Sequence, residues 1–231
     1  MVANPQTVAA PDSGRRRVAP ELLARAGPQD REANLRDIAR INHWFGGHRL
    51  ARNLMGEVAG RSESLCILDA GSASGDMGRA IQREFVRCTV VSLDRRRLHL
   101  DGAREPRVAA DVFQPPFPPR SFDIVFCSLL LHEYADGEAE LLLRRLFGLA
   151  RRALIVIDLY RHPFAYHFLP ATRCLFRWHP MTLHDGPVSV AAAFRPKQLR
   201  ELARAAGLEH VRVRLHWPWF RISLLARRSD A

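Results

Sequence analysis

The stretch that decides the fold runs Leu-Cys-Ile-Leu-Asp-Ala-Gly-Ser-Ala-Ser-Gly-Asp, residues 65–76. Its apolar run meets an acid at Asp69, and two glycines, Gly71 and Gly75, come before a helix start at Asp76. This order is typical of a buried parallel strand, a tight turn and a helix N-terminus. Open α/β sheets bind nucleotides at such turns, at the carboxyl ends of their strands. The stretch therefore predicts a nucleotide site, although an ordinary glycine-containing turn is the alternative.

The spacing of the glycines indicates which kind of nucleotide. A dinucleotide site has the pattern G-x-G-x-x-G and holds a pyrophosphate at the helix N-terminus. Here Gly71 and Gly75 are separated by three residues, and Asp76 stands where that pyrophosphate would be. A carboxylate there repels a diphosphate, which argues against a nicotinamide-dependent oxidoreductase. Together with Asp69 it suits a ligand that carries positive ammonium and sulfonium groups, as S-adenosylmethionine does.

Acidic residues also end the next two predicted strands. A β-branched run over residues 88–93 is followed by Asp94, nineteen residues past the second glycine. This is the geometry of a carboxylate that accepts both ribose hydroxyls, although a solvated loop acid next to Arg95 is the alternative. A shorter strand contains Asp111 and Val112 before a rigid proline-rich loop. It would hold a carboxylate level with the adenine amino group.

A buried strand over residues 121–128 follows, beginning Ser-Phe-Asp. The whole series resembles the class I S-adenosylmethionine-dependent methyltransferases, in particular those that act on small molecules in quinone and natural-product biosynthesis. Ala73 replaces the middle glycine of that family's first motif. The resemblance covers residues 62–160 closely. It implies a Rossmann-like, doubly wound α/β fold, with a seven-stranded, mostly parallel sheet whose last strand is antiparallel.

The resemblance also implies the cofactor, S-adenosylmethionine, and the residues that bind it. Asp69, Gly71 and Gly75 would cradle the methionine part, Asp94 would hold the ribose, and Ser128 would lie beside the cofactor. The full set of expected cofactor-binding residues is Asp69, Gly71, Ser72, Gly75, Asp94, Arg95, Asp111, Val112 and Ser128.

The chain divides into three predicted regions. Residues 1–30 are rich in Pro, Ala, Gly and Arg and are expected to form a flexible N-terminal tail. Residues 31–60 carry apolar side chains at helical spacing and form an N-terminal helical cap, which either covers a sheet edge or roofs the cofactor pocket. Residues 61–231 form the methyltransferase domain, and residues 160–194 are inserted after its fifth strand as a substrate lid.

The expected lid and two histidines bear on the methyl acceptor. Seven of the chain's nineteen aromatic residues fall in the lid, which favours an apolar pocket and a small hydrophobic or aromatic acceptor, methylated on oxygen or carbon. Alternatively, these rings only pack the insertion onto the sheet. His132, just past the fourth strand, and His184, beside Asp185, are the candidate general bases.

Composition limits the other classes of function. The net charge is +11, and 34 of the 35 basic residues are arginine, spread along the chain. We expect no nucleic-acid partner, but an RNA methyltransferase stays as an alternative, as does a non-catalytic S-adenosylmethionine-binding partner subunit. The four cysteines lack metal-site spacing, so we expect buried reduced thiols, no metal and a cytoplasmic location. No apolar run is long enough for a membrane span. The sequence leaves the oligomeric state open.

Overall fold

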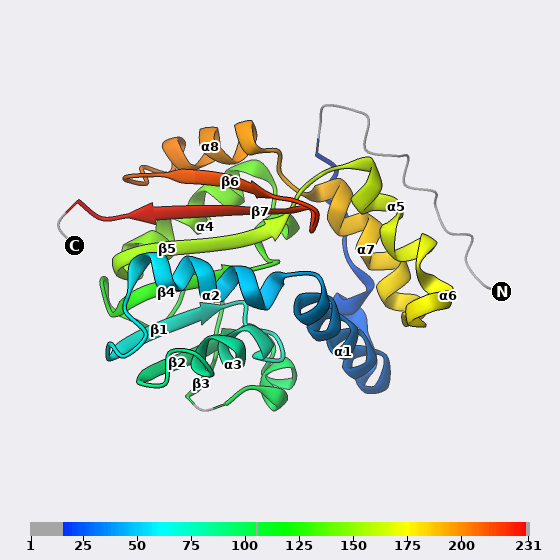
Figure 1. Ribbon diagram of the computed structural model, residues 1–231, viewed down its shortest axis with the longest axis horizontal. Helices are drawn as coiled ribbons and strands as arrows, with labels where there is room; N and C mark the ends of the chain where they lie inside the picture. Colours follow the sequence, from blue (N-terminus) through cyan, green and yellow to red (C-terminus); the bar gives the residue numbers. More distant parts are fainter. Residues whose placement is uncertain (1–15, 105, 230–231) are drawn as a thin grey trace.

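The computed structural model describes residues 16–104 and 106–229 (Figure 1). The strands are β1 (Leu65–Ala70), β2 (Cys88–Asp94), β3 (Arg107–Ala109), β4 (Phe122–Ser128), β5 (Ala150–Leu159), β6 (Arg212–His216) and β7 (Arg221–Arg227). The α-helices are α1 (Pro28–Trp44), α2 (Gly47–Val58), α3 (Asp76–Gln82), α4 (Asp136–Leu149), α5 (Pro163–Ala171), α6 (Arg173–Phe176), α7 (Pro180–Ala192) and α8 (Pro196–Ala205). Three 3₁₀ turns lie at Leu22–Arg25 (η1), Arg97–Gly102 (η2) and Leu131–Glu133 (η3).

The strands form one seven-stranded sheet in the order β3-β2-β1-β4-β5-β7-β6. Neighbouring strands from β3 to β5 are parallel, whereas β7 runs antiparallel to both β5 and β6. The order reverses at β1, where β2 and β4 diverge to opposite sides. In sheets of this kind the ligand crevice lies at that switch point, beyond the carboxyl ends of the strands. The predicted fold class is confirmed.

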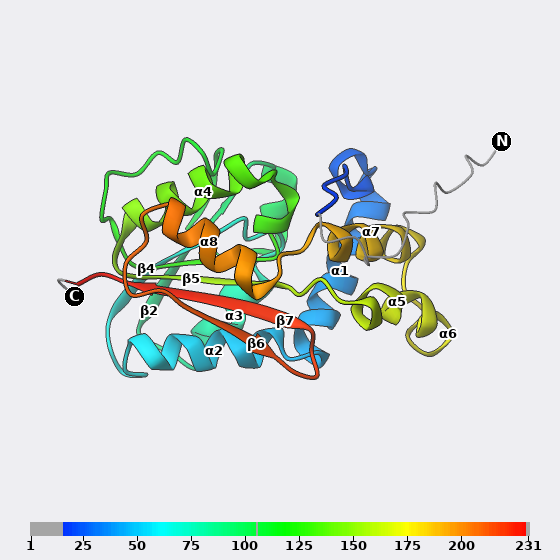
Figure 2. The same cartoon turned by 90° about the horizontal axis from the view of Figure 1, so that it is seen from above.

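Helices cover both faces of the sheet (Figure 2). On one face, leucines of α4 and α8 pack on Leu68, Val125 and Leu154. On the other face, α2 and α3 pack on Ile67 and Ile124. Consecutive strand residues such as Ile67 and Leu68 belong to the two separate cores because strand side chains alternate between faces. This explains why the central strands are apolar throughout.

A third group of helices lies beyond the carboxyl ends of the strands rather than on a face. The insertion after β5 forms α5, α6 and α7, and α7 packs against both α5 and α1 (Figures 1 and 2). The turn between α1 and α2 requires glycine at Gly46, whose φ is +77° and where a Cβ would lie 2.6 Å from Trp219 Cδ1. The insertion and the N-terminal helices therefore stand over the switch point together.

The N-terminal segment differs from the expected flexible tail over residues 16–30; residues 1–15 lie outside the described part of the chain. Arg16 stacks on Phe194 with its guanidinium carbon 3.5 Å from the ring centre, and it donates to the carbonyls of Tyr134 and Ala192. Asp185 accepts hydrogen bonds from two backbone N–H groups of η1. Its fixed partners, rather than its composition, decide the conformation of this segment.

Among residues 16–104 and 106–229, no helix has both the length and the apolar character needed to cross a lipid bilayer.

Candidate functional site

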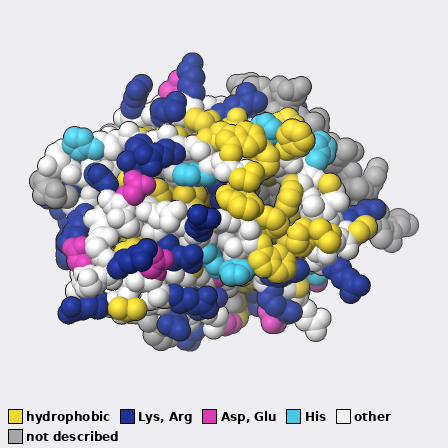
Figure 3. All heavy atoms as spheres, viewed as in Figure 1, with side chains coloured by type: hydrophobic (Ala, Val, Ile, Leu, Met, Phe, Trp, Pro, Cys, Tyr) yellow, Lys and Arg dark blue, Asp and Glu magenta, His cyan; other side chains and the backbone are white. Residues whose placement is uncertain are grey.

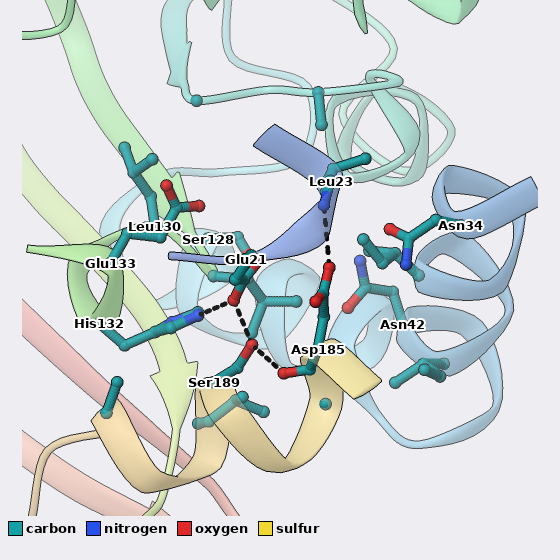
Figure 4. Close-up of a pocket in the computed structure, with 18 of the residues that line it drawn as sticks. Glu21, Leu23, Asn34, Asn42, Ser128, Leu130, His132, Glu133, Asp185 and Ser189 are labelled. Carbon is teal, nitrogen blue, oxygen red and sulfur yellow. Dashed lines mark hydrogen bonds and ion pairs between the residues drawn. The ribbon is translucent and has the colours of Figure 1, made fainter. Parts of the chain in front are cut away.

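A cavity of about 610 Å³ lies between the carboxyl ends of β1, β2 and β4 and the helices above them. Its lining comes from four parts of the chain that are distant in sequence: residues 19–23, α1, the strand ends, and the insertion with the β6–β7 turn. Figure 4 shows how η1, α1 and α7 bring their side chains towards the strand ends. The volume falls in the ~300–1,000 Å³ range of small-molecule sites.

The turn after β1 forms one wall of this cavity. The backbone N–H groups of Gly71 and Ser72 both donate to the Leu93 carbonyl, at 2.8 and 3.0 Å, which bends the chain away from the strand. Gly71 has a φ of +72°, and a Cβ there would lie 2.7 Å from Leu130 Cδ2. Ala73 also adopts a positive φ, +45°, a conformation that is unfavourable for a residue with a Cβ. The turn is therefore tight and strained where Ala73 replaces glycine.

Three buried polar atoms at the ends of β1 and β4 lack partners. Within the described part of the chain, no hydrogen-bond partner is found for Asp69 Oδ2, Ser72 Oγ or Ser128 Oγ, and all three residues line the cavity. Burial, aided by the nearby charge of Asp76, raises the pKa of Asp69 to about 8. Buried polar groups are nearly always hydrogen-bonded in folded proteins. This cluster is thus prepared for a polar, cationic ligand.

Asp94 faces the same turn from the end of β2. Its carboxylate accepts hydrogen bonds from the backbone N–H groups of Ala73, at 3.1 Å, and Arg96, at 2.8 Å. His99 Nδ1 lies 3.3 Å from Asp94 Oδ1, the oxygen that also accepts from Arg96. These contacts fix the carboxylate at the rim of the cavity.

The other expected cofactor residues divide into two groups. Arg95, Asp111 and Val112 line the cavity. Gly75 does not line it. Gly75 is instead the left-handed residue before α3, with a φ of +69°, and a Cβ there would lie 2.7 Å from that of Ala103. It shapes the turn without facing the ligand space.

His132, the first candidate base, is buried between two carboxylates. Its Nδ1 lies 2.6 Å from Asp158 Oδ1, and its Nε2 lies 3.5 Å from Glu21 Oε1 (Figure 4). Burial by itself would lower the pKa of His132, but Asp158 and Glu21 outweigh it and raise that pKa well above its ordinary value. The imidazole is therefore charged at neutral pH in this arrangement. A charged imidazole must first give up a proton before it can accept one from a substrate.

His184, the second candidate base, is not among the residues that line the cavity. Its half-exposed ring bonds to its neighbour, with Nδ1 2.9 Å from Asp185 Oδ1. Asp185 and Ser189 line the cavity instead, because residues four apart share one face of a helix while the adjacent residue points elsewhere. The expected position of His184 beside the acceptor is not what the structure shows.

Sequence reasoning missed Glu21, which lay in the segment taken for a tail. Glu21 bonds to Ser189 as well as to His132. Burial would raise the pKa of Glu21, but the hydrogen bond and charge of the His132 imidazole, together with the hydrogen bond from Ser189, lower it. The signal for Glu21 in the sequence is weak: it is a single acid among apolar and basic neighbours.

A second buried network was also missed. The Arg221 guanidinium donates to Asn42 Oδ1 at 2.8 Å, while Asn42 and His48 both contact Asp76 Oδ2, at 3.0 and 2.8 Å. Burial lowers the pKa of Arg221 to about 10, against the raising effect of Asp158 and Asp76. Asp76 Oδ2 is therefore held by hydrogen-bonding partners within the protein, although Asp76 also lines the cavity.

The other half of the cavity is apolar. Side chains from α1, α5, α7 and the residues that follow α1 and precede β7 enclose it: Ile38, Ile41, Phe45, Phe168, Leu169, Val188 and Phe220. Asn34 adds a buried amide oxygen with no partner among the described residues, and its amide nitrogen donates to Thr182 Oγ1 at 3.2 Å. The cavity thus joins a polar compartment at the strand ends to an apolar compartment under the helices.

Residues 67–152 match the family model described as a methyltransferase domain. The chain is similar to pluviatolide O-methyltransferase from Sinopodophyllum hexandrum, with 35% identity over 102 residues, or 42% of this chain and 27% of that protein. Both matches agree with the sequence resemblance to the class I S-adenosylmethionine-dependent methyltransferases.

Solved structures show the same fold. Human N-acetylserotonin methyltransferase in complex with S-adenosylmethionine aligns with a TM-score of 0.60 at 16% identity, over 89% of this chain and 57% of that one. Magnesium protoporphyrin IX methyltransferase from Synechocystis, with S-adenosylhomocysteine bound, aligns with a TM-score of 0.58 at 18% identity, over 84% and 87% of the two chains. The chain spans about a quarter of the curated relative and little more than half of the human protein.

Proposed function

We propose that this protein transfers a methyl group from S-adenosylmethionine to a hydroxyl oxygen of a small hydrophobic or aromatic acceptor. The observation that supports this most strongly is a single cavity with two compartments. At the strand ends, buried oxygens of Asp69, Ser72 and Ser128 lack hydrogen-bond partners among the described residues, and an apolar compartment lies beside them. The curated relative is named an O-methyltransferase, which favours oxygen as the methylated atom.

The polar compartment fits the cofactor. Asp69 has a buried oxygen without a donor, and Gly71 leaves backbone space that a side chain would fill. In this proposal Asp69, Gly71 and Ser72 hold the methionine part, Asp94 and Arg95 hold the ribose, Asp111 and Val112 hold the adenine, and Ser128 lies beside them. When bound, S-adenosylmethionine supplies the methyl group on a sulfonium, which is an electrophile at neutral pH.

The apolar compartment would orient the acceptor and keep water away from the reacting atoms. Orientation of two reactants in a dry site supplies a large part of the rate of a displacement reaction. Phe45, Phe168 and Phe220 bring flat rings into this compartment. Such a lining favours an aromatic acceptor over a nucleotide, whose phosphates would find no cation among these rings.

His132 is the residue proposed to take the proton of the acceptor hydroxyl. Asp158 fixes the ring through Nδ1, which leaves Nε2 directed at the cavity and at Glu21. An acceptor hydroxyl that displaced Glu21 from Nε2 would remove one of the two charges that raise the pKa of His132. The pKa of His132 would then fall, the ring would release its proton to solvent, and the neutral Nε2 could accept the proton of the acceptor hydroxyl.

Two measurements test the proposal. Calorimetry with S-adenosylmethionine and with S-adenosylhomocysteine should show binding in the micromolar range, and absence of heat with both on folded protein would contradict it. Labelled S-adenosylmethionine should then transfer its label to members of a panel of hydrophobic phenols and not to RNA. Label in RNA alone would favour the RNA methyltransferase. Tight binding without transfer to any acceptor would favour the non-catalytic subunit.

A further inference from the structure

One side of the molecule exposes large apolar side chains from three parts of the chain. We call these residues the aromatic face: Trp44 (45% exposed), Phe164 (73%), Leu175 (76%), Trp217 (56%) and Trp219 (40%). Figure 3 shows hydrophobic side chains gathered into a continuous area on this side. Single exposed apolar residues are common on protein surfaces, but a contiguous group marks a site of interaction.

The insertion helices carry much of this face. α5 reads Pro-Phe-Ala-Tyr-His-Phe-Leu-Pro-Ala, contains no Asp, Glu, Lys or Arg, and has no fully buried residue. α6 has no fully buried residue either. A surface helix in water normally presents charged side chains to the solvent and buries its apolar stripe. α5 turns Phe168 and Leu169 towards the cavity but presents no charged side chain to the solvent, so its outer side is suited to a less polar surrounding than water.

The aromatic face is also the outer side of the cavity wall. Trp219 lines the cavity and is exposed to solvent at the same time. Its ring centre lies 6.2 Å from that of Phe45, and Trp217 lies 4.8 Å from Phe220, both cavity-lining partners. Phe164 lies 6.4 Å from Phe220. A continuous layer of rings therefore separates the apolar compartment from the surroundings on this side.

The insertion helices and the β6–β7 hairpin carry basic residues and no acids of their own. Residues 159–184 and 210–229, which build α5, α6 and the hairpin, contain no Asp or Glu. Arg173 and Arg177 are exposed within them, whereas Arg214 is exposed but pairs with Glu57 of α2. Tryptophan rings with arginines at their margin are the composition found at membrane–water interfaces, and arginines gain from anionic headgroups. A second copy of the chain would set the arginines of α6 against the same arginines, with like charges opposed.

We propose that the aromatic face docks this protein onto the surface of an anionic lipid bilayer, with α5 lying at the level of the headgroups. A bilayer surface supplies both an apolar layer for the rings and negative charge for the arginines. Docking itself does not depend on the proposed methyl transfer. If that function holds, an apolar acceptor dissolved in the bilayer would reach the cavity through the ring layer without crossing water.

Vesicle flotation tests the docking. The folded full chain is mixed with vesicles of phosphatidylcholine, or of phosphatidylcholine with about 30 mol % phosphatidylglycerol. We expect the protein to float with the anionic vesicles and only weakly with the neutral ones. Its fluorescence should shift to shorter wavelength on binding, because three of the four tryptophans are exposed on the aromatic face.

Two pairs of variants locate the contact. Leu175→Ser should lower the vesicle partition coefficient about fivefold, whereas Val86→Ser, at a residue equally exposed (76%) but outside the face, should leave it unchanged. Arg173→Gln should weaken binding to anionic vesicles about fivefold, and Arg204→Gln, on α8, should not. All four positions are exposed, so the variants should fold.

The outcomes separate this inference from the proposed function. The docking is overturned if both variants of a pair lose vesicle binding equally, or if the wild type does not float with anionic vesicles. A concentration-dependent dimer in light scattering that Leu175→Ser dissolves, without vesicle binding, would assign the face to a second copy instead. S-adenosylmethionine binding measured by calorimetry should be the same in all four variants. If the wild type did not bind S-adenosylmethionine, the proposed function would be contradicted, but the docking test would still stand.

Discussion

Glu21 and His132 form a buried carboxylate–imidazole pair, 3.5 Å apart, between the N-terminal segment and the end of the fourth strand. Arg16 anchors the same segment, through the carbonyls of His132 and Tyr134. The pair closes the cavity on the side of the candidate base. In the proposed function, release of His132 from Glu21 therefore requires this part of the N-terminal segment to move.

Replacing Glu21 with glutamine should shift the titration of His132. Glu21→Gln keeps the shape and removes one of the two charges that raise the pKa of His132, so that pKa should fall. The imidazole is then neutral over a wider pH range, and the acid limb of the rate–pH profile should move to lower pH. Nuclear magnetic resonance of the histidine side chains gives the pKa directly. Glu201→Gln, at an exposed acid on α8, is the matched control. A profile that moves equally in both variants would rule out the role given to Glu21.

Cofactor binding should release a proton from Asp69. Its pKa of about 8 lies above the ordinary value of 3.8, so at pH 7 the folded protein holds a proton there that the unfolded chain lacks. Between these two values the folded state binds more protons, and the stability contributed by this group falls as the pH rises. A cation placed beside Asp69 lowers its pKa and expels the proton. Calorimetry at pH 7 in two buffers of different ionisation enthalpy should show release of up to about one proton per cofactor bound.

The variant Asp69→Asn tests whether the released proton comes from Asp69. Cofactor binding to Asp69→Asn should release no proton from this position. Asp101→Asn, at an exposed acid outside the cavity, should behave as the wild type. If Asp69→Asn does not bind the cofactor, unfolding of the free protein gives a second readout. The wild type should lose more stability than the variant between about pH 5 and pH 8. Equal slopes would show that Asp69 is ionised in the fold.

Removal of the Asp94 carboxylate should weaken cofactor binding by about 1–3 kcal/mol, because a partly buried charged acceptor of hydrogen bonds is lost. Asp94→Ala also frees the Ala73 N–H that the carboxylate now holds, so the turn after β1 should loosen. Calorimetry with S-adenosylhomocysteine measures the change, and Asp101→Ala is the control. Unchanged affinity in Asp94→Ala would show that the ribose is bound elsewhere.

The fold and the polar half of the site could be predicted from the sequence because their signals are local. The run from Leu65 to Asp76 sets a strand, a turn and a helix start in order, and strand ends place Asp94 and Asp111 at the same sheet edge. These inferences need only two facts: the spacing of apolar residues along the chain, and the edge of the sheet at which the carboxyl ends of parallel strands meet.

The rest of the candidate site depends on contacts between segments that are distant in the sequence, and such contacts leave no local sequence signal. Nothing in the neighbours of Glu21 shows that a chain lacking helical or strand period folds back onto η3 and α7. The direction of His184 is likewise set by how α7 rotates on α5, since Asp185 rather than its neighbour faces the cavity. Asp76 shows the same limit: its charge was visible, but not its partners Asn42 and His48.

Two glycine positions should respond in opposite directions to the same substitution. Gly75→Ala forces a Cβ into a left-handed conformation, 2.7 Å from the Cβ and 2.8 Å from the Cα of Ala103, neither of which can rotate away. We expect a loss of roughly 1–3 kcal/mol of stability, together with weaker cofactor binding. Gly137→Ala, in α4, meets nothing within 4 Å and should stabilise the protein by roughly 0.5–1 kcal/mol. Urea unfolding of both variants measures the difference, and a Gly75→Ala protein as stable as the wild type would contradict this account of the turn.

Ala73 offers the converse experiment, because it holds a left-handed conformation without being glycine. At a φ of +45° its Cβ costs about 1–2 kcal/mol, whereas glycine would lose about 0.4–1 kcal/mol through the greater freedom of its unfolded chain. Ala73→Gly should therefore raise the free energy of unfolding by about 0.5 kcal/mol. Ala33→Gly, the same substitution inside α1, should lower it by about 1 kcal/mol. Because Ala73 also lines the cavity, its replacement should leave more room at the turn and strengthen S-adenosylmethionine binding, which the control should not do. Urea unfolding and calorimetry on the two variants give both quantities, and a loss of stability of equal size in both would mean that the turn is not strained at Ala73.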